Sequence, residues 1–200
     1  MQTIICLDLE GVLVPEVWHG VAERTGIDEL RATTRDIPDY DVLMKQRLKL
    51  LNENGLTVDL IQEVISKIQP LEGAQKFLNE LRKDYEVIIL SDTFYEFATP
   101  LMAHLNFPTL FCHELIIEEG VIKGYKLRMQ DQKKHAVVAL KNLKFNVITA
   151  GDSYNDINML READKGVLFR PPEHIEKEFP EFSVITEYTE LREFIDKNVA

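Results

Sequence analysis

The chain has 200 residues, which is enough for one large domain, or one domain with a substantial insertion, around a sizeable core. Apolar residues make up 45% of it and charged residues 28%, as in ordinary water-soluble globular proteins. The net charge of −11 argues against non-specific binding to nucleic acid or to an anionic membrane, so an anionic substrate would need local cations to receive it.

The first predicted element is a short buried strand at residues 3–7, which ends in two carboxylates. Asp8 and Glu10 lie two positions apart and so point to the same side of an extended backbone, and Gly11 lets the chain turn sharply. Ligands of open α/β sheets bind beyond the carboxyl ends of the strands, which predicts that this pair faces a pocket. The alternative is a charged strand end that merely stops β-pairing.

A block from residue 15 to residue 70 follows, with almost no strand signal. Its helices are predicted at residues 16–25, 40–52 and 58–68, the last of them behind the capping residue Thr57. A polar loop at residues 33–39 separates the first two helices. Prolines at both of its ends mark this block as a candidate inserted domain between residues 1–14 and 71–200.

From residue 71 onward, helices and strands alternate. Helices are predicted at residues 73–84, 94–105, 134–143, 155–163 and 187–199. Strands are predicted at residues 87–90, 110–117, 147–150, 166–169 and 184–185, with a hairpin turn at residues 118–120 that leads into a further strand at residues 121–122. This alternation is typical of an α/β fold, a Rossmann-like parallel sheet with helices on both faces.

The cysteines and the N-terminus predict a cytoplasmic location. Cys6 and Cys112 each lie inside an apolar run, which is typical of buried thiols in a reducing compartment rather than of a catalytic or metal-binding pair. Asp8 interrupts the only candidate for a cleavable apolar leader, and no stretch approaches the length of a membrane span.

Three of the predicted strands end in polar motifs. These motifs are Asp8 with Glu10, Ser91-Asp92-Thr93, and Gly151-Asp152-Ser153-Tyr154-Asn155-Asp156. Side by side in one sheet, they would crowd several carboxylates into one crevice, and clustered anions require a cation. Ligands that are all oxygen select a hard cation, so we expect Mg²⁺ rather than zinc.

The order Asp-x-Glu-Gly, Ser-Asp-Thr, a lysine and Gly-Asp-x-x-x-Asp resembles the haloacid dehalogenase superfamily of phosphohydrolases and phosphotransferases. The block at residues 15–70 resembles that superfamily's small helical cap, which determines substrate specificity. Glu16, Arg47 and the polar loop at residues 35–41 are similar to the phosphoserine phosphatase branch. Residues 34–48, 91–97 and 151–156 closely resemble a bifunctional subgroup of this branch, whose members also pass the phosphoryl group of phosphoserine to homoserine.

This resemblance implies covalent catalysis. Asp8 would be the nucleophile that forms an aspartyl-phosphate, and Glu10 would protonate the leaving alkoxide and then deprotonate the acceptor. The carboxylates of Asp8 and Asp152, with the backbone carbonyl of Glu10, would hold Mg²⁺. Asp156 is expected to orient metal-bound water or the lysine rather than to bind the metal directly.

The resemblance also implies residues that bind the phosphate. Ser91 and a lysine would hold the phosphate oxygens, and the spacing to Asp152 favours Lys133 over its neighbour Lys134. Two further residues, Asp92 and Asn155, are predicted to contact the substrate. The alternative for Asn155 is a helix N-cap.

The amino-acid end of phosphoserine is expected to lie against the helical block. By resemblance, Glu16 would pair with the ammonium group, and Arg47 would bind the carboxylate through two parallel hydrogen bonds. The alternative for Arg47 is a solvated position on an exposed helix face.

The chain departs from the superfamily pattern at two positions, where Glu10 replaces the usual aspartate and Val12 replaces a threonine or serine. Glu10 matches the bifunctional subgroup.

Two competing functions are a phosphatase of another small metabolite and a non-enzymatic phospho-acceptor domain like a response-regulator receiver, although receivers lack a helical insertion at this point of the chain. The absence of a Gly-x-x-x-x-Gly-Lys-Ser/Thr loop argues against a nucleotide-driven kinase. The sequence leaves the oligomeric state open, with a homodimer as one option.

Overall fold

The computed structural model of the protein describes residues 2–34, 36–37 and 39–199. Its central sheet has the strand order β4-β3-β2-β1-β5-β6-β7, and only the β3–β4 pair is antiparallel. The strands are β1 (Thr3–Leu7), β2 (Glu86–Phe94), β3 (Thr109–Glu118), β4 (Val121–Lys126), β5 (Asn146–Gly151), β6 (Lys165–Phe169) and β7 (Ser183–Ile185). The predicted α/β fold with a largely parallel sheet is confirmed.

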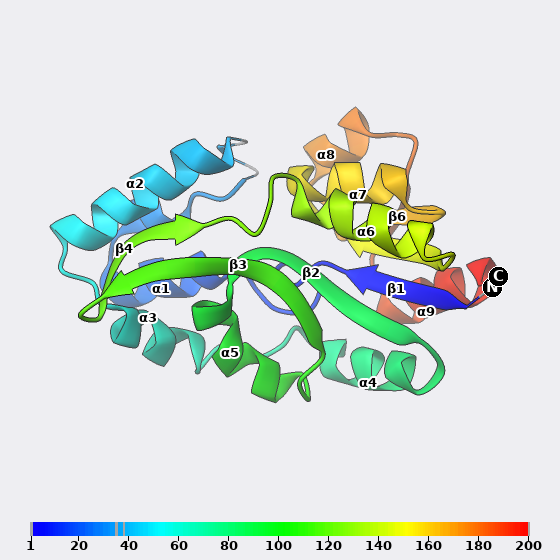
Figure 1. Ribbon diagram of the computed structural model, residues 1–200, viewed down its shortest axis with the longest axis horizontal. Helices are drawn as coiled ribbons and strands as arrows, with labels where there is room; N and C mark the ends of the chain where they lie inside the picture. Colours follow the sequence, from blue (N-terminus) through cyan, green and yellow to red (C-terminus); the bar gives the residue numbers. More distant parts are fainter. Residues whose placement is uncertain (1, 35, 38, 200) are drawn as a thin grey trace.

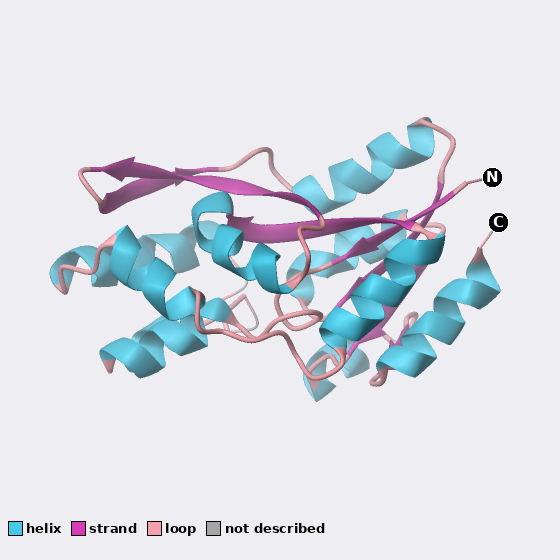
Figure 2. Ribbon diagram, turned by 90° about the horizontal axis from the view of Figure 1, so that it is seen from below, coloured by secondary structure: helices cyan, strands magenta, loops and turns pink. Residues whose placement is uncertain are grey.

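Helices cover the sheet on both sides (Figure 2). They are α1 (Val17–Thr25), α2 (Tyr40–Glu53), α3 (Val58–Ile65), α4 (Ala74–Asp84), α5 (Tyr95–His104), α6 (Gln132–Asn142), α7 (Ile157–Glu162), α8 (Glu173–Glu178) and α9 (Tyr188–Asn198). Short 3₁₀ turns occupy Asp28–Arg31 and Tyr154–Asp156.

The position of β1 at the centre of the sheet explains its continuous apolar run. All five of its residues are buried, since Ile5 and Leu7 pack into the core cluster on one face and Ile4 and Cys6 pack into the cluster on the other. A strand covered on both faces needs apolar side chains at successive positions rather than at alternate ones. As predicted, Cys6 and Cys112 are free and buried.

Several of the predicted helix boundaries were wrong. Helix α6 begins at Gln132, two residues earlier than predicted, and α3 ends at Ile65 rather than at Ile68. The predicted helix at residues 155–163 starts as a 3₁₀ turn. Helix α8 was not predicted, because its six residues contain a single buried apolar side chain, Ile175, and so show no periodicity.

The helices α1, α2 and α3 form a separate group beside the sheet, at the left of Figure 1. The chain returns to its point of departure after this group, because the Leu71 amide donates to the Leu13 carbonyl at 2.9 Å. This close return is what an inserted domain requires, and the boundaries at residues 15 and 70 stay a prediction.

The β3–β4 hairpin extends from the sheet onto this helical group (Figure 1). The Val58 amide donates to the Gly120 carbonyl at 3.0 Å, and the Tyr125 hydroxyl donates to the Asp41 carboxylate. The helical group is therefore held by the hairpin as well as by its two connections to the sheet. Among the described helices, none is long and apolar enough to cross a membrane.

Candidate active site

A cavity lies at the carboxyl-end side of β1, β2 and β5, where the sequence predicted a pocket. Strand β2 continues to Phe94 rather than ending at residue 90 as predicted, so Ser91 and Asp92 lie within the strand near its end, where its register with β3 shifts. These three segments contribute Asp8, Glu10, Ser91, Asp92, Ser153 and Asn155 to the lining, and the helical group contributes Glu16, Trp18, Tyr40 and Arg47. The three polar motifs thus meet in one place. This outcome favours a pocket over a charged strand end as the explanation of Asp8 and Glu10.

Asp8 is buried and paired with a lysine. The Nζ atom of Lys133 lies 2.8 Å from Asp8 Oδ1 and 2.8 Å from Asp156 Oδ1. Burial and the charge of Asp156 raise the pKa of Asp8 well above its usual value, although Lys133 opposes this. Burial alone would lower the pKa of Lys133, but the charges of Asp156 and Asp8 raise it, so the ammonium stays protonated. Lys134, in contrast, is only partly buried.

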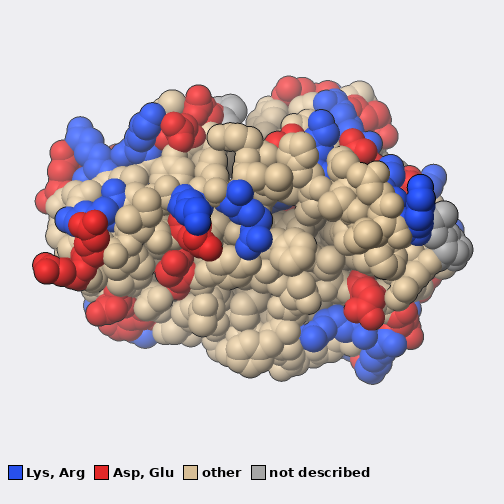
Figure 3. Space-filling view, viewed as in Figure 1, with Lys and Arg blue, Asp and Glu red and all other residues tan. Residues whose placement is uncertain are grey.

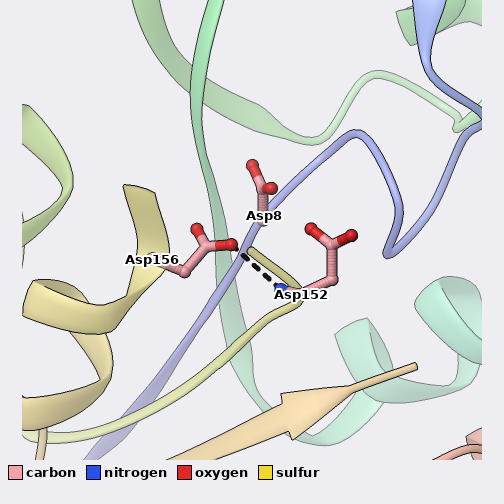
Figure 4. A group of neighbouring side chains, drawn as sticks. All are labelled: Asp8, Asp152 and Asp156. Atoms are coloured by element: carbon pink, nitrogen blue, oxygen red, sulfur yellow. Dashed lines mark hydrogen bonds between the residues drawn. The ribbon is translucent and has the colours of Figure 1, made fainter. Parts of the chain in front are cut away.

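Three carboxylates, those of Asp8, Asp152 and Asp156, lie close to one another (Figure 4), and two of them, Asp8 and Asp156, contact Lys133. Each offers an oxygen atom within 4.8 Å of the others, and all three residues are buried. Asp156 Oδ2 accepts hydrogen bonds from the Asp152 and Ser153 amides at 2.9 and 3.1 Å. Asp156 is thus tied to Lys133 and to the backbone, as expected of a group that orients the lysine.

The acidic cluster brings three buried carboxylates together, and two of them contact the Lys133 ammonium. Buried carboxylates are stable when they are paired or bound to a metal. The donors are all oxygen, which suits a hard divalent cation such as Mg²⁺. The residues present therefore fit the predicted metal.

The two loops that carry the cluster depend on glycines. Gly11 has a φ of +80°, and a Cβ atom there would lie 2.3 Å from Asp152 Oδ2. A Cβ atom on Gly151 would lie 2.3 Å from Asp156 Cγ. Both glycines leave room for a carboxylate of the cluster to lie directly against the backbone.

We expect Gly11→Ala to damage the site more than the fold. The left-handed conformation costs an alanine about 1–2 kcal/mol, and the new methyl group would displace Asp152. Gly26→Ala is the matched control, since Gly26 has a φ of +74° but a Cβ atom there would meet no atom of the described residues within 4 Å. Urea unfolding should show similar losses for both variants, whereas titration calorimetry should show weaker Mg²⁺ binding for Gly11→Ala alone. Equal Mg²⁺ binding by the two variants would contradict this assignment.

Glu10 is held at the start of α1. Its Oε2 atom accepts a hydrogen bond from the Val17 amide at 3.0 Å. Burial, followed by the nearby charge of Glu16, raises the pKa of Glu10 to about 7, while the Val17 amide and Arg47 oppose this shift. A carboxyl group with this pKa can both give and take a proton near neutral pH.

The raised pKa predicts a pH-dependent stability for the metal-free protein. The folded state holds the Glu10 proton up to about pH 7, whereas an unfolded chain releases it near pH 4.5. The stabilisation is therefore complete below pH 4.5 and is lost as pH rises to about 7, by up to about 3 kcal/mol. Glu10→Gln cannot ionise, so urea unfolding in a chelator should show wild type losing stability relative to this variant across that window. If the free energy of unfolding changed with pH in the same way in both proteins, the raised pKa of Glu10 would be contradicted.

A hydrogen bond joins the Ser91-Asp92-Thr93 motif to the motif at residues 151–156. Ser91 is buried, and its Oγ atom accepts from the Thr93 amide at 3.2 Å, which leaves its hydroxyl hydrogen free to be donated. Asn155 Nδ2 donates to Asp92 Oδ2 at 2.8 Å. The adjacent turn is capped by Ser153 with Asp156, so the alternative role of Asn155 as an N-cap was wrong.

Arg47 lies inside the cavity rather than on a solvated helix face. It is 6% exposed, its Nη2 atom donates to the Ala32 carbonyl at 2.8 Å, and its guanidinium carbon lies 4.4 Å from the centre of the Trp18 ring. Its buried Nε atom has no hydrogen-bond partner among the described residues. Burial lowers the pKa of Arg47 to about 10, so it remains a cation that faces the cavity with an unused donor.

On the face seen in Figure 3, Lys and Arg side chains are interspersed with Asp and Glu, both along the edges and near the middle. Inside the cavity, Arg47 is a positive charge that is available to an anionic group. Glu16 also lines the cavity, whereas Arg35 of the predicted specificity loop lies outside the described residues.

Three residues around the site were not predicted from the sequence. The Tyr40 hydroxyl donates to the Asp92 carbonyl at 2.8 Å, and Gln132 Nε2 donates to the Ser91 carbonyl at 2.5 Å. His113 Nε2 lies 3.4 Å from Asp92 Oδ1. A histidine within the apolar run of β3 and a glutamine beside the predicted lysine were the signals that could have drawn attention to two of them.

Known proteins resemble this chain in both sequence and fold. A family model described as a haloacid dehalogenase-like hydrolase matches residues 3–164. Phosphoserine phosphatase ThrH of Pseudomonas aeruginosa is 58% identical over 96% of this chain and 95% of its own length. A phosphoserine phosphatase of Pseudomonas syringae pv. tomato is also 58% identical, over 96% of this chain and 82% of its own. The solved structure titled phospho-aspartyl intermediate analogue of phosphoserine phosphatase shares the fold, with a TM-score of 0.79 at 20% identity over 100% of this chain and 99% of that one.

Proposed function

This chain belongs to the haloacid dehalogenase-like hydrolases, and we propose that it is a Mg²⁺-dependent phosphoserine phosphatase that also transfers the phosphoryl group to homoserine. Family membership confirms the expectation drawn from the motifs, and the two Pseudomonas relatives carry the name phosphoserine phosphatase at 58% identity. The observation that supports this function best is one cavity lined both by Asp8, which contacts the buried Lys133, and by the buried Arg47. The first suits a phosphate group and the second suits an amino-acid carboxylate.

The first half of the reaction breaks the phosphate ester. Asp8 Oδ attacks phosphorus, the bond from phosphorus to the serine oxygen breaks, and Glu10 gives its proton to that oxygen. Lys133, which contacts Asp8, and the Ser91 hydroxyl would hold the non-bridging oxygens while charge moves onto them. Serine leaves, and the phosphoryl group stays on Asp8 as an acyl phosphate.

The second half releases the phosphoryl group. The oxygen of water or of the homoserine hydroxyl attacks phosphorus, its proton passes to Glu10, and the bond to Asp8 breaks. Water gives inorganic phosphate, and homoserine gives O-phosphohomoserine. The pKa of about 7 lets Glu10 act as the acid in one half and as the base in the other.

The carboxylates of Asp8 and Asp152 and the backbone carbonyl of Glu10 would hold Mg²⁺. When bound, the metal offsets the negative charges of carboxylate and phosphate so that they can approach each other. Asp156 keeps Lys133 oriented through their 2.8 Å contact, a role that leaves the metal to the other carboxylates.

We assign specificity to the helical group at residues 15–70, which we propose is a cap over the catalytic core. Arg47 would bind the substrate carboxylate through its guanidinium, and Glu16 would accept from the ammonium group; both residues line the cavity. Trp18 supports the Arg47 guanidinium from one side, so the charge is presented in a fixed orientation.

The test follows both products from one reaction mixture. Purified protein with Mg²⁺ and phosphoserine should release phosphate, and added homoserine should divert part of the phosphoryl group into O-phosphohomoserine, visible by ³¹P NMR. Phosphate release without any phosphohomoserine would support the phosphatase activity and contradict the transfer to homoserine. Inactivity on phosphoserine, with activity on another small phosphate ester, would contradict the assignment of phosphoserine as the substrate.

A further inference from the structure

A second cavity of about 190 Å³ lies beside the candidate active site, large enough for several water molecules. Four residues line both cavities and so form the wall between them: Thr34, Tyr40, Asp92 and Asn155. The far side of this second cavity is lined by groups that take no part in the mechanism above, such as Met129 and Asp131. Water held there is one wall away from the phosphoryl group.

Hydrogen bonds to Asp92 close this wall. The Tyr40 hydroxyl donates to the Asp92 carbonyl at 2.8 Å, and Asn155 Nδ2 donates to Asp92 Oδ2 at 2.8 Å. Asp92 therefore joins helix α2 of the cap, strand β2 and the loop after β5. Three of the four shared residues form one connected unit.

His113 contacts the other carboxylate oxygen of Asp92, Oδ1. It is 3% exposed, and its Nδ1 atom accepts from the Arg128 amide at 3.1 Å, which places the ring hydrogen of the neutral imidazole on Nε2. Nε2 then faces Asp92 Oδ1 at 3.4 Å, and Gln132 Nε2 faces the same oxygen at 3.3 Å. Both carboxylate oxygens are thus engaged by protein donors.

These contacts favour a second role for Asp92 beside the predicted contact with the substrate. A free carboxylate beside a phosphate would repel it, whereas this one is turned toward donors in the wall. Burial alone would raise the pKa of Asp92, but the charge of Lys133 and the hydrogen bonds from His113 and Asn155 hold it well below its usual range. The side chain is therefore a permanent anion with fixed partners.

We propose that Asp92 closes the catalytic cavity against water from the second cavity, that His113 is the positioning residue for it, and that this wall favours homoserine over water as the acceptor. The inference deepens the proposed function and rests on it. Restricting the access of water favours an alcohol over water as the acceptor of the acyl phosphate on Asp8. The wall would supply that restriction on the side of the site that adjoins the second cavity.

The ratio of O-phosphohomoserine to inorganic phosphate, followed by ³¹P NMR at fixed phosphoserine and homoserine, tests this proposal. We expect His113→Leu to lower the ratio about tenfold, since it removes one hydrogen bond to a charged group. His113→Gln should restore it, because the amide nitrogen can replace Nε2. Asp92→Ala should lower the ratio at least as far, and Tyr40→Phe should lower it less. Unchanged ratios in His113→Leu and Asp92→Ala would overturn the proposal.

Two further readouts separate this inference from the transfer activity. If the wild type makes no phosphohomoserine, the proposed transfer is wrong. The wall is then tested by rapid-quench measurement of the lifetime of the acyl phosphate on Asp8, with water as the only acceptor. A shorter lifetime in Asp92→Ala than in wild type supports the proposed exclusion of water, and an equal lifetime overturns it. In the resting protein, ¹⁵N NMR should show His113 protonated at Nε2. A hydrogen on Nδ1 would overturn its role as donor to Asp92.

Discussion

The Asp8→Asn variant should lose turnover of every phosphate ester, by at least about 10⁴-fold. The amide cannot attack phosphorus, so neither serine nor an aryl alcohol is released and no acyl phosphate forms. The fold should survive, because burial and Asp156 already disfavour the charged form of Asp8. Removing a charge that the folded state destabilises should leave the unfolding temperature equal or higher.

Steady-state kinetics on a preparation verified by mass spectrometry measure this loss, and beryllium fluoride binding reports the site independently. Wild type should bind the fluoride as an acyl-phosphate mimic, and the variant should not. Asp152→Asn is the informative companion, since it keeps the nucleophile and should chiefly raise the Mg²⁺ concentration needed for activity. Substantial turnover by a clean Asp8→Asn preparation would exclude covalent catalysis by this residue.

Arg47→Ala should reduce kcat/KM for phosphoserine far more than for an aryl phosphate. A buried, hydrogen-bonded charge contact with the substrate carboxylate is worth about 2–5 kcal/mol, or roughly 30-fold to several thousandfold in rate. The aryl ester has no carboxylate to lose and a better leaving group, so its rate should be retained. Arg47→Lys should recover little, because an ammonium cannot form two parallel hydrogen bonds.

Lys45→Ala is the matched control, since Lys45 lies on the same helix with its side chain 73% exposed and paired with Asp41. It should leave both substrates unaffected. Equal losses on both substrates in Arg47→Ala would make Arg47 a structural or phosphate-binding residue. Unchanged rates on both substrates would assign specificity to other residues of the helical group at residues 15–70.

The sequence was sufficient for the arrangement of the core and for the meeting of its three motifs. Strands β1 and β5 are apolar at successive positions because both of their faces are covered, and each ends at the polar residues that line the cavity. Parallel strands bring their carboxyl ends to one edge of the sheet, so the grouping of Asp8, Ser91 and Asp152 followed from order and spacing alone.

Other features depended on contacts that a linear pattern does not contain. Choosing Lys133 over Lys134 from the residues alone required the true start of α6, and the ammonium contacts to Asp8 and Asp156 decide it. Tyr40 and His113 meet Asp92 only because β3 pairs with β2 and the first residue of α2 reaches β2. Each of these side chains looks ordinary in its own segment.

The length of β3 has a mechanical consequence. Its first half pairs with β2 inside the core, and its second half pairs with β4 and reaches the helical group, where Gly120 accepts from Val58. One continuous strand thus connects the core sheet to the helical group of α1, α2 and α3. A helical group held only by its two connections could rotate freely, whereas motion of this one must bend or twist β3. The ease with which the helical group moves relative to the core should therefore depend on the stiffness of β3.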